Sequence, residues 1–225
     1  AVVMSQGIEI GDVMHGIRAD QAAGKLGGAR LLFAGRGIGA PNAGPGGAAY
    51  AGIAYEVTTD EQIRRAVREQ AARKVDTIKV WVDDRAGRAP RLTPALFRAA
   101  IEEGRRLGLT VTAHVFYHDD AAALAGAGAS AFAHLVRDKV MDDALIASMN
   151  KNKVYVMPNI GTPERATHSA PPAWFEEPNL AAMLNDTVAP EVVERIRKSF
   201  SSREAAVVAR NRQNYAILQQ SVARL

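Results

Sequence analysis

Short apolar runs alternate along the chain with segments in which apolar residues recur at helical spacing. The apolar runs are rich in Val, Ile, Leu and Phe, and they predict six strands, at residues 1–5, 30–34, 77–82, 110–116, 131–135 and 154–157. Strands that are apolar on both faces are typical of a parallel sheet covered on both sides. We therefore expect a parallel sheet built from repeated strand–helix units.

Helical segments are predicted between and after these strands. Thr93 followed by Pro94 is a typical helix start, with a capping side chain and then proline at the first helical position. The full set of predicted helices is 59–74, 93–107, 119–125, 142–149, 191–200 and 203–225. This alternation favours an α/β fold, as an open doubly wound sheet or as a (β/α)8 barrel lacking two of its strands.

The two ends of the sequence bear on domain organisation. Residue 1 already lies in a predicted strand, and residue 225 ends a predicted helix. We expect residues 1–225 to form a single domain that is the central part of a longer protein.

Composition and charge narrow the classes of function. Lys and Arg number 28 against 24 Asp and Glu, a net charge of +4, but opposite charges alternate closely, as in residues 60–65, so they predict solvated helix faces. No basic run is interleaved with aromatic residues, which argues against nucleic-acid binding. No apolar stretch reaches the roughly 18 residues of a membrane span, and the absence of cysteine excludes disulfides and thiolate chemistry. We expect a soluble protein, and we take a cytoplasmic location as the default, because the absence of cysteine does not identify the compartment.

The segment 35–47 is rich in glycine and proline and follows a predicted strand. Ligand-binding loops occupy this position in both candidate architectures. Its glycines are spaced GxGxG, it lacks the Gly-Lys-Ser/Thr ending of a P-loop, and no helix begins directly after it. Three interpretations stay open: a substrate lid, the nucleotide cradle of a doubly wound binding module, and an exposed connection whose glycines permit tight turns.

Three polar residues interrupt otherwise apolar strands, each late in its strand: Lys79, His114 and His134. Burial of a lysine is costly unless it is paired or chemically altered. Late residues of neighbouring parallel strands converge at one mouth of a barrel, where barrel enzymes have their sites. Neutral imidazoles are good zinc ligands. A lysine that captures carbon dioxide becomes a carbamate, whose two oxygens can bridge two metal ions.

The segments that carry these residues resemble the amidohydrolase superfamily of metal-dependent hydrolases, in the branch of imidazolonepropionase-like enzymes and prolidase-like peptidases. The resemblance rests on residues 76–84, 112–116 and 132–138, and residues 156–159 resemble the strand that follows. It implies a distorted TIM barrel of which strands 2–7 are present and strands 1 and 8 are missing. It also implies one or two divalent ions, commonly zinc, held by carboxylated Lys79, His114 and His134. Metal-activated hydroxide would then attack an amide, lactam, ester or peptide-like bond of a small-molecule substrate.

The chain departs from the family pattern at both missing strands. The His-x-His pair of the first strand is absent, because no two of His15, His114, His118, His134 and His168 are two residues apart. The general-base aspartate of the eighth strand is absent too, so we expect it outside the chain and expect no hydrolysis from this stretch alone. A second copy or a complementing chain segment would supply the missing strands and cover two open sheet edges. A catalytically silent fragment is the alternative.

Four further residues are candidates for substrate binding: Phe116, Tyr117, His118 and Arg137. Phe116 stands where related peptidases have a tyrosine that helps bind a substrate carboxylate, and Tyr117 follows it. The alternative for His118 is a role in capping the next helix, together with the acidic residues after it. For Arg137 the alternative is a surface ion pair with Asp138.

Overall fold

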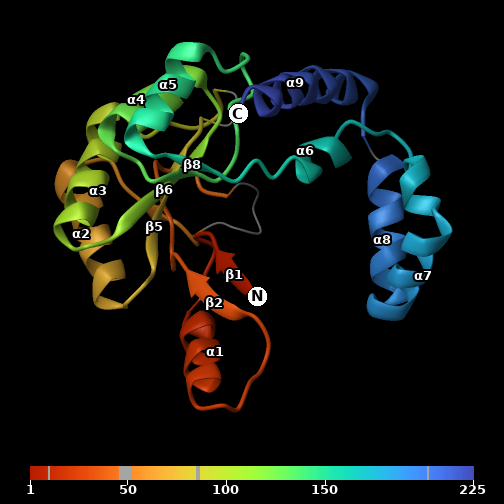
Figure 1. Cartoon of the computed structure of the whole chain (residues 1–225), viewed down its shortest axis with the longest axis horizontal. Helices are drawn as coiled ribbons and strands as arrows, with labels where there is room; N and C mark the ends of the chain where they lie inside the picture. The colour runs from red at the N-terminus through yellow and green to blue at the C-terminus, as the bar shows by residue number, and fades with distance from the viewer. Residues whose placement is uncertain (10, 46–51, 85–86, 202) are drawn as a thin grey trace. The chain divides into compact units, whose positions relative to one another are not determined.

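The computed structural model describes residues 1–9, 11–45, 52–84, 87–201 and 203–225. They form two compact units, Ala1–Pro158 and Asn159–Leu225 (Figure 1). That residues 1–225 act as one domain stays a prediction. Within the described ranges, no helix is long and apolar enough to cross a membrane.

The first unit is built on parallel strands. Its main sheet has the order β4-β3-β5-β6-β7-β8, and β1 pairs with β2 in a second sheet. The strands are β1 (Val2–Ser5), β2 (Arg30–Phe33), β3 (Ile38–Gly39), β4 (Tyr55–Glu56), β5 (Thr77–Val82), β6 (Thr110–Val115), β7 (Ala131–Phe132) and β8 (Tyr155–Val156). The sequence prediction missed β3 and β4, because each is only two residues long and they lie in and beyond the glycine-rich segment. It also extended β7 too far, since the chain bends at residues 133 and 134.

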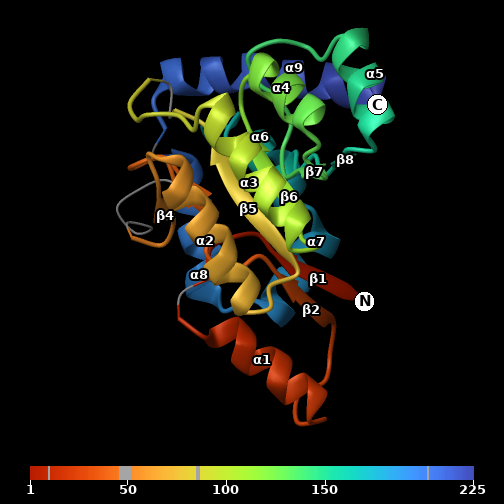
Figure 2. The ribbon, with the colours of Figure 1, turned by 90° about the vertical axis from the view of Figure 1, so that its left-hand side faces the viewer.

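Helices α2 to α5 connect the strands of the main sheet, and each packs against the next. Figure 2 shows α2 and α3 side by side along β5 and β6. The helices of this unit are α1 (Val13–Ala22), α2 (Asp60–Ala72), α3 (Pro94–Arg106), α4 (His118–Ala127) and α5 (Asp143–Asn152). Local chemistry sets their starts: the Thr59 side chain caps α2 in a capping box with Gln62, and the Thr93 hydroxyl accepts from the Leu96 N–H at the start of α3.

The order of the strands has features of both predicted architectures. From β3 through β5, β6 and β7 to β8, neighbours follow the order of the chain, and only β4 lies outside this progression. A doubly wound sheet reverses its strand order at a switch point, whereas a barrel adds strands in sequence. The run from β3 to β8 is in chain order, as in a barrel, whereas β4 on the other side of β3 reverses the order, as in a doubly wound sheet. Strand order alone therefore does not select one of the two architectures.

Strand β5 is buried along its whole length, which explains its apolar sequence. Alternation along the strand puts Ile78, Val80 and Val82 on one face of the sheet and Lys79 and Trp81 on the other. Burial of each aliphatic side chain stabilises the fold by about 1.5–3 kcal/mol relative to exposure. The lysine therefore lies inside a strand whose other residues are buried for packing.

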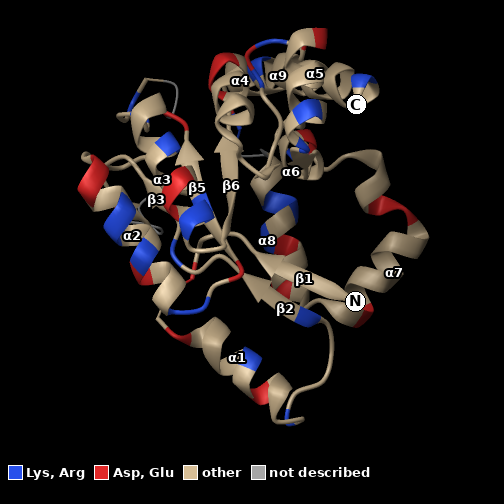
Figure 3. Ribbon diagram, turned by 60° about the vertical axis from the view of Figure 1, so that its left-hand side comes forward, with Lys and Arg blue, Asp and Glu red and all other residues tan. Residues whose placement is uncertain are grey.

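Charged residues of both signs are interspersed on the exposed side of α2 (Figure 3). Arg64 pairs with Asp60 of the same helix at 2.7 Å and with Glu102 of α3 at 2.8 Å. Glu103, which is buried, pairs with Arg106 at 2.6 Å. The predicted pairing of opposite charges on solvated helix faces is thus present and joins α2 to α3.

The second unit consists of helical segments around a small core of Phe175, Val193 and Phe200. Two side chains of its last helix hold the segment after its first, as Asn211 donates to the Ala166 carbonyl and Arg212 to the Thr167 carbonyl, both at 3.0 Å. Its elements are α6 (Gly161–Arg165), η2 (Ala173–Glu176), α7 (Pro178–Thr187), α8 (Pro190–Ser201) and α9 (Ala205–Arg224). Helices α8 and α9 match the predicted helices at 191–200 and 203–225, whereas α6 and α7 were not predicted.

Candidate functional site

Lys79 lies in the middle of β5, and its side chain is almost completely buried, at 2% exposure. It is opposite Thr112 of β6, and Trp81 is opposite His114, so Lys79 and His114 lie on the same face of the sheet. In the described part of the chain, the Lys79 ammonium makes no hydrogen bond or ion pair, and its Nζ lies 6.0 Å from the centre of the Trp81 ring. Burial lowers the pKa of Lys79 to about 7. A large share of this side chain is therefore a neutral amine at neutral pH, the form that reacts with carbon dioxide.

His114 lies near the carboxyl end of β6 and is buried. Its Nε2 is 3.0 Å from Oδ2 of Asp83, the residue directly after β5. Burial lowers the pKa of His114 to about 4, assisted by the positive charge of Lys79 and opposed by Asp83. His114 is therefore a neutral imidazole at neutral pH.

His134 meets His114 edge to face, with ring centres 4.8 Å apart. Burial, together with the charges of His114 and Lys79, lowers the pKa of His134 to about 3. Ala113 is opposite Phe132 in the sheet, so a straight continuation of β7 would put His134 on the face away from His114. The bends at residues 133 and 134 interrupt this alternation and bring the two rings together.

The structure thus brings the three sequence-predicted ligands into one local environment. Two neutral imidazoles suit zinc, and the lysine adds an anionic ligand once it is carboxylated. Among the residues that the structure describes, no group of three or more His, Cys, Asp or Glu side chains is placed to hold a metal ion. The described chain therefore offers a partial donor set of one lysine and two histidines.

Two of the residues predicted to bind substrate, Phe116 and Tyr117, contact other side chains of the protein. The Tyr117 hydroxyl donates to Asp84 Oδ1 at 2.8 Å, and its ring lies under the Arg91 guanidinium at 4.7 Å. Burial and the hydrogen bond to Asp84 raise the pKa of Tyr117 to about 12. Phe116 packs edge to face on Tyr117, with ring centres 4.9 Å apart. The hydroxyl of Tyr117 is therefore used within the protein, and substrate contact by this pair stays a prediction.

His118 is the first residue of α4 and is buried. Its main-chain N–H donates to Asp138 Oδ1 at 2.9 Å, and its ring Nε2 lies 3.3 Å from Asp142 Oδ1. The N–H of His118 is thus capped by Asp138, whereas neither ring nitrogen of His118 makes a hydrogen bond within the described residues, so both interpretations of His118 stay predictions. The Arg137 guanidinium lies 5.9 Å from the Phe116 ring, and its charge lowers the pKa of both site histidines, so Arg137 belongs to the surroundings of the site.

Sequence reasoning assigned no role to Asp83 and Asp84, although both contact candidate residues. The available signal was their position: two acidic residues directly after a buried parallel strand lie at the edge where barrel sites form.

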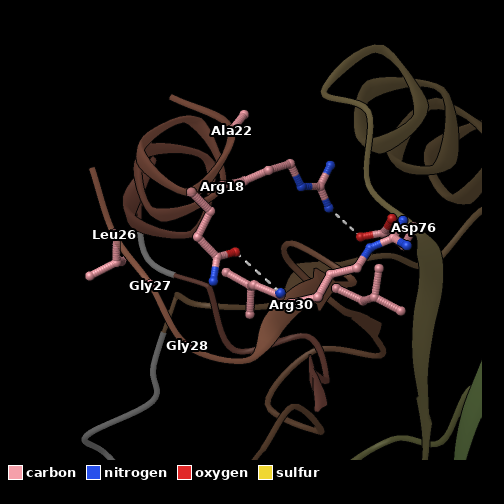
Figure 4. A pocket seen from close by; sticks show the side chains of 10 residues that line it. Arg18, Ala22, Leu26, Gly27, Gly28, Arg30 and Asp76 are labelled. Atoms are coloured by element: carbon pink, nitrogen blue, oxygen red, sulfur yellow. Dashed lines mark hydrogen bonds and ion pairs between the residues drawn. The ribbon is translucent and has the colours of Figure 1, made fainter. Parts of the chain in front are cut away.

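A separate pocket of about 480 Å³ is lined by Arg18 and Gln21 of α1, by Arg30 and by Asp76 (Figure 4). Arg30 begins β2 and Asp76 precedes β5, so this pocket lies at the amino ends of the strands. His114 and His134 lie toward the carboxyl ends of β6 and β7 instead, and Lys79 lies in the middle of β5 rather than late in it as predicted. Within the pocket Arg18 donates to the Asp76 carboxylate, and also to the Lys74 carbonyl at 2.8 Å.

No family model matches the chain. An uncharacterized protein of Mycobacterium tuberculosis and one of Mycobacterium bovis are each 31% identical over 135 residues, which cover 58% of this chain and 34% of theirs. The chain thus spans about a third of the length of these curated relatives.

Solved structures of hydrolases share the fold over nearly the whole chain. A Xaa-Pro dipeptidase with methionine bound in its active site is 20% identical with a TM-score of 0.61, covering 96% of this chain and 52% of its own. An amidohydrolase is 18% identical with a TM-score of 0.59, covering 98% and 52%. The ochratoxinase of A. niger is 15% identical with a TM-score of 0.60, covering 97% and 49%.

These likenesses concern the fold, and the chain spans about half the length of these solved structures. The chain has an α/β fold with a parallel sheet that matches part of an amidohydrolase barrel. The resemblance predicted from residues 76–84, 112–116 and 132–138 is confirmed at this level. Which of the eight barrel strands are present stays a prediction.

Proposed function

We propose that this chain is part of a metal-dependent hydrolase of the amidohydrolase type, which cleaves an amide, lactam, ester or peptide-like C–N or C–O bond of a small molecule. One observation carries the proposal: a buried lysine without an ionic partner in the described chain shares its environment with two neutral imidazoles. Burial of a lysine costs stability unless its amine is paired or chemically altered, and carboxylation is such an alteration. The fold shared with solved hydrolases supports the same conclusion.

Carboxylated Lys79, His114 and His134 would hold one or two divalent ions such as zinc. When bound, the metal would supply an activated water and polarise the scissile carbonyl. The contribution of this chain is to keep both imidazoles neutral by burial, so that their ring nitrogens retain lone pairs. The remaining ligands and the general-base aspartate are proposed to come from a second copy or from another chain segment.

Carboxylation of Lys79 needs the neutral amine. Its Nζ lone pair forms a bond to the carbon of carbon dioxide, a C=O electron pair moves to oxygen, and the proton that Nζ loses passes to solvent water. Because burial has already lowered the pKa of Lys79 to about 7, the amine does not need strong base to react.

The binding-module alternative relied on the glycine-rich segment 35–47, of which residues 46 and 47 lie outside the described ranges. Gly37 lies so close to Trp81 that an added Cβ would be 2.1 Å from the indole Cζ3. This glycine is therefore required for packing. Because packing explains it, a phosphate-binding role is not needed.

The test is the metal content of the chain. The protein is supplied with zinc and ¹³C-bicarbonate, and bound metal is measured by elemental mass spectrometry and the carbamate by ¹³C NMR. We expect about one to two zinc ions per chain and a carbamate signal, both lost in Lys79→Ala. Lys25→Ala is the control, because the Lys25 side chain is 74% exposed.

Two results would contradict the proposal. Full metal occupancy in Lys79→Ala would remove the role of Lys79. No metal in the unsubstituted chain would favour the catalytically silent fragment, and the claim of catalysis would be withdrawn.

A further inference from the structure

Two consecutive carboxylates follow β5 and contact different residues at the end of β6. Asp83 Oδ2 lies 3.0 Å from His114 Nε2, whereas Asp84 Oδ1 accepts a hydrogen bond of 2.8 Å from the Tyr117 hydroxyl. The Asp83 and His114 side chains are only 7% and 9% exposed. The carboxyl ends of the two strands are therefore joined by two side-chain contacts, of which the one to His114 is buried.

The contact with Asp83 restricts which nitrogen of His114 carries the proton. An ionised carboxylate only accepts hydrogen bonds, so the imidazole nitrogen that faces it must be the N–H. A neutral imidazole has one such proton, and with Nε2–H donating to Asp83, Nδ1 is left with its lone pair. His114 then has a single nitrogen free to bind a metal ion.

We propose that Asp83 is a positioning residue for His114, which holds the imidazole in its Nε2–H form and orientation so that Nδ1 is the ligating nitrogen. The ligation part rests on the proposed function, whereas the position of the proton is a property of the metal-free chain. Carboxylate–histidine pairs that support a metal ligand fix its tautomer and raise its basicity. Asp83 accordingly acts through His114 and has no direct role in the reaction.

The first experiment observes the proton without metal. The chain is labelled with ¹⁵N-histidine, stripped of metal with a chelator and examined by long-range ¹H–¹⁵N correlation NMR at neutral pH, with His114 assigned through His114→Gln. We expect a protonated Nε2 and an unprotonated Nδ1, with the Nε2–H proton shifted downfield by its hydrogen bond. Asp83→Ala should remove this downfield shift and mix the two tautomers.

The neighbouring carboxylate supplies the matched control. Asp84→Asn changes the same charge one residue away but leaves the Asp83–His114 contact, so the His114 signals should stay as they are. Asp83→Asn is the second variant, for use if Asp83→Ala unfolds the chain. Its side-chain amide keeps an oxygen that accepts from Nε2–H, so it should keep part of the downfield shift. A protonated Nδ1 in the unsubstituted chain, or unchanged His114 signals in Asp83→Ala and Asp83→Asn, would overturn the proposal whether or not the chain binds metal.

The second experiment measures zinc affinity by competition with a chelating dye. Loss of a supporting contact of this kind typically weakens metal binding about 10–100-fold, and we expect this for Asp83→Ala. Asp84→Asn should bind zinc as the unsubstituted chain does. Equal affinity in Asp83→Ala would refute the ligation part, and no zinc binding by any variant would refute the proposed function while the NMR result still decides the position of the proton.

Discussion

Replacement of Gly37 by alanine tests how the glycine-rich segment packs against the candidate site. Gly37 lies between β2 and β3, and its backbone φ is not positive, so alanine is conformationally acceptable there. The obstacle is Trp81. An added Cβ would be 2.1 Å from Cζ3, 2.4 Å from Cη2 and 2.9 Å from Cε3 of the indole.

The expected loss follows from these distances. Ordinary van der Waals contact of a Cβ lies at 3.4–4 Å, so ring and backbone must separate by more than an ångström. Trp81 is only 4% exposed, so its ring has little solvent to move into. Overpacking costs about 1–3 kcal/mol and occasionally more, and we expect about 3 kcal/mol for Gly37→Ala. Typical domains have roughly 5–15 kcal/mol of stability, so the variant should still fold.

Urea unfolding followed by far-UV circular dichroism measures this loss. Trp81→Leu removes the ring atoms that the new methyl group meets, and in that background Gly37→Ala should cost under about 1 kcal/mol. Gly126→Ala is the control, since nothing lies within 4 Å of the added Cβ, and its place inside α4 should make it neutral or stabilising. Equal losses from Gly37→Ala in both backgrounds would refute the reasoning.

Two further predictions concern contacts that hold the first unit together. Glu103 pairs with Arg106 of its own helix and with Arg68 of α2, and the hydrogen bond with Arg106 holds the pKa of Glu103 below its ordinary value. Glu103→Gln should lower the free energy of unfolding by about 1.5–3 kcal/mol at neutral pH. A carboxylate whose pKa is depressed in the native state stabilises the fold above its unfolded pKa, near 4.3, and this contribution is lost as the pH falls through the native pKa. Urea titrations should therefore show a smaller difference in unfolding free energy between Glu103→Gln and the unsubstituted chain at acid pH than at neutral pH. An equal difference at both pH values would contradict this. Arg18→Ala removes the pair with Asp76 and a guanidinium that lies 4.0 Å over a phenylalanine ring. We expect a loss of about 1–2 kcal/mol by thermal unfolding, and a melting temperature equal to that of the unsubstituted chain would show that this contact contributes nothing.

The elements that could be predicted are those whose local sequence already matches their environment. Strand β5 was predicted with its observed bounds, since every residue is buried and the sequence is apolar but for Thr77 and Lys79. Helices α2 and α3 were predicted through Thr59 and Thr93, which cap them as expected. Strands β3 and β4 gave no such signal, because a two-residue strand has no periodicity and depends on pairing with neighbours distant in the chain.

The candidate site was predicted by an argument that holds for two residues and needed a correction for the third. Lys79 and His114 share a face because their strands pair in register, with Trp81 opposite His114. His134 was expected on the same face because it also comes late in a strand, yet alternation from Phe132 would turn it to the other side.

The bends that bring the His134 ring against His114 lie in the backbone after β7, and no residue pattern in the sequence predicted them. The same limit explains why Asp83 received no role. Its contact with His114 depends on the relative register of two strands separated by a helix, which spacing along the chain does not determine. A polar residue inside an apolar strand is visible in one sequence, whereas the partner that orients it becomes visible only when the strands are aligned.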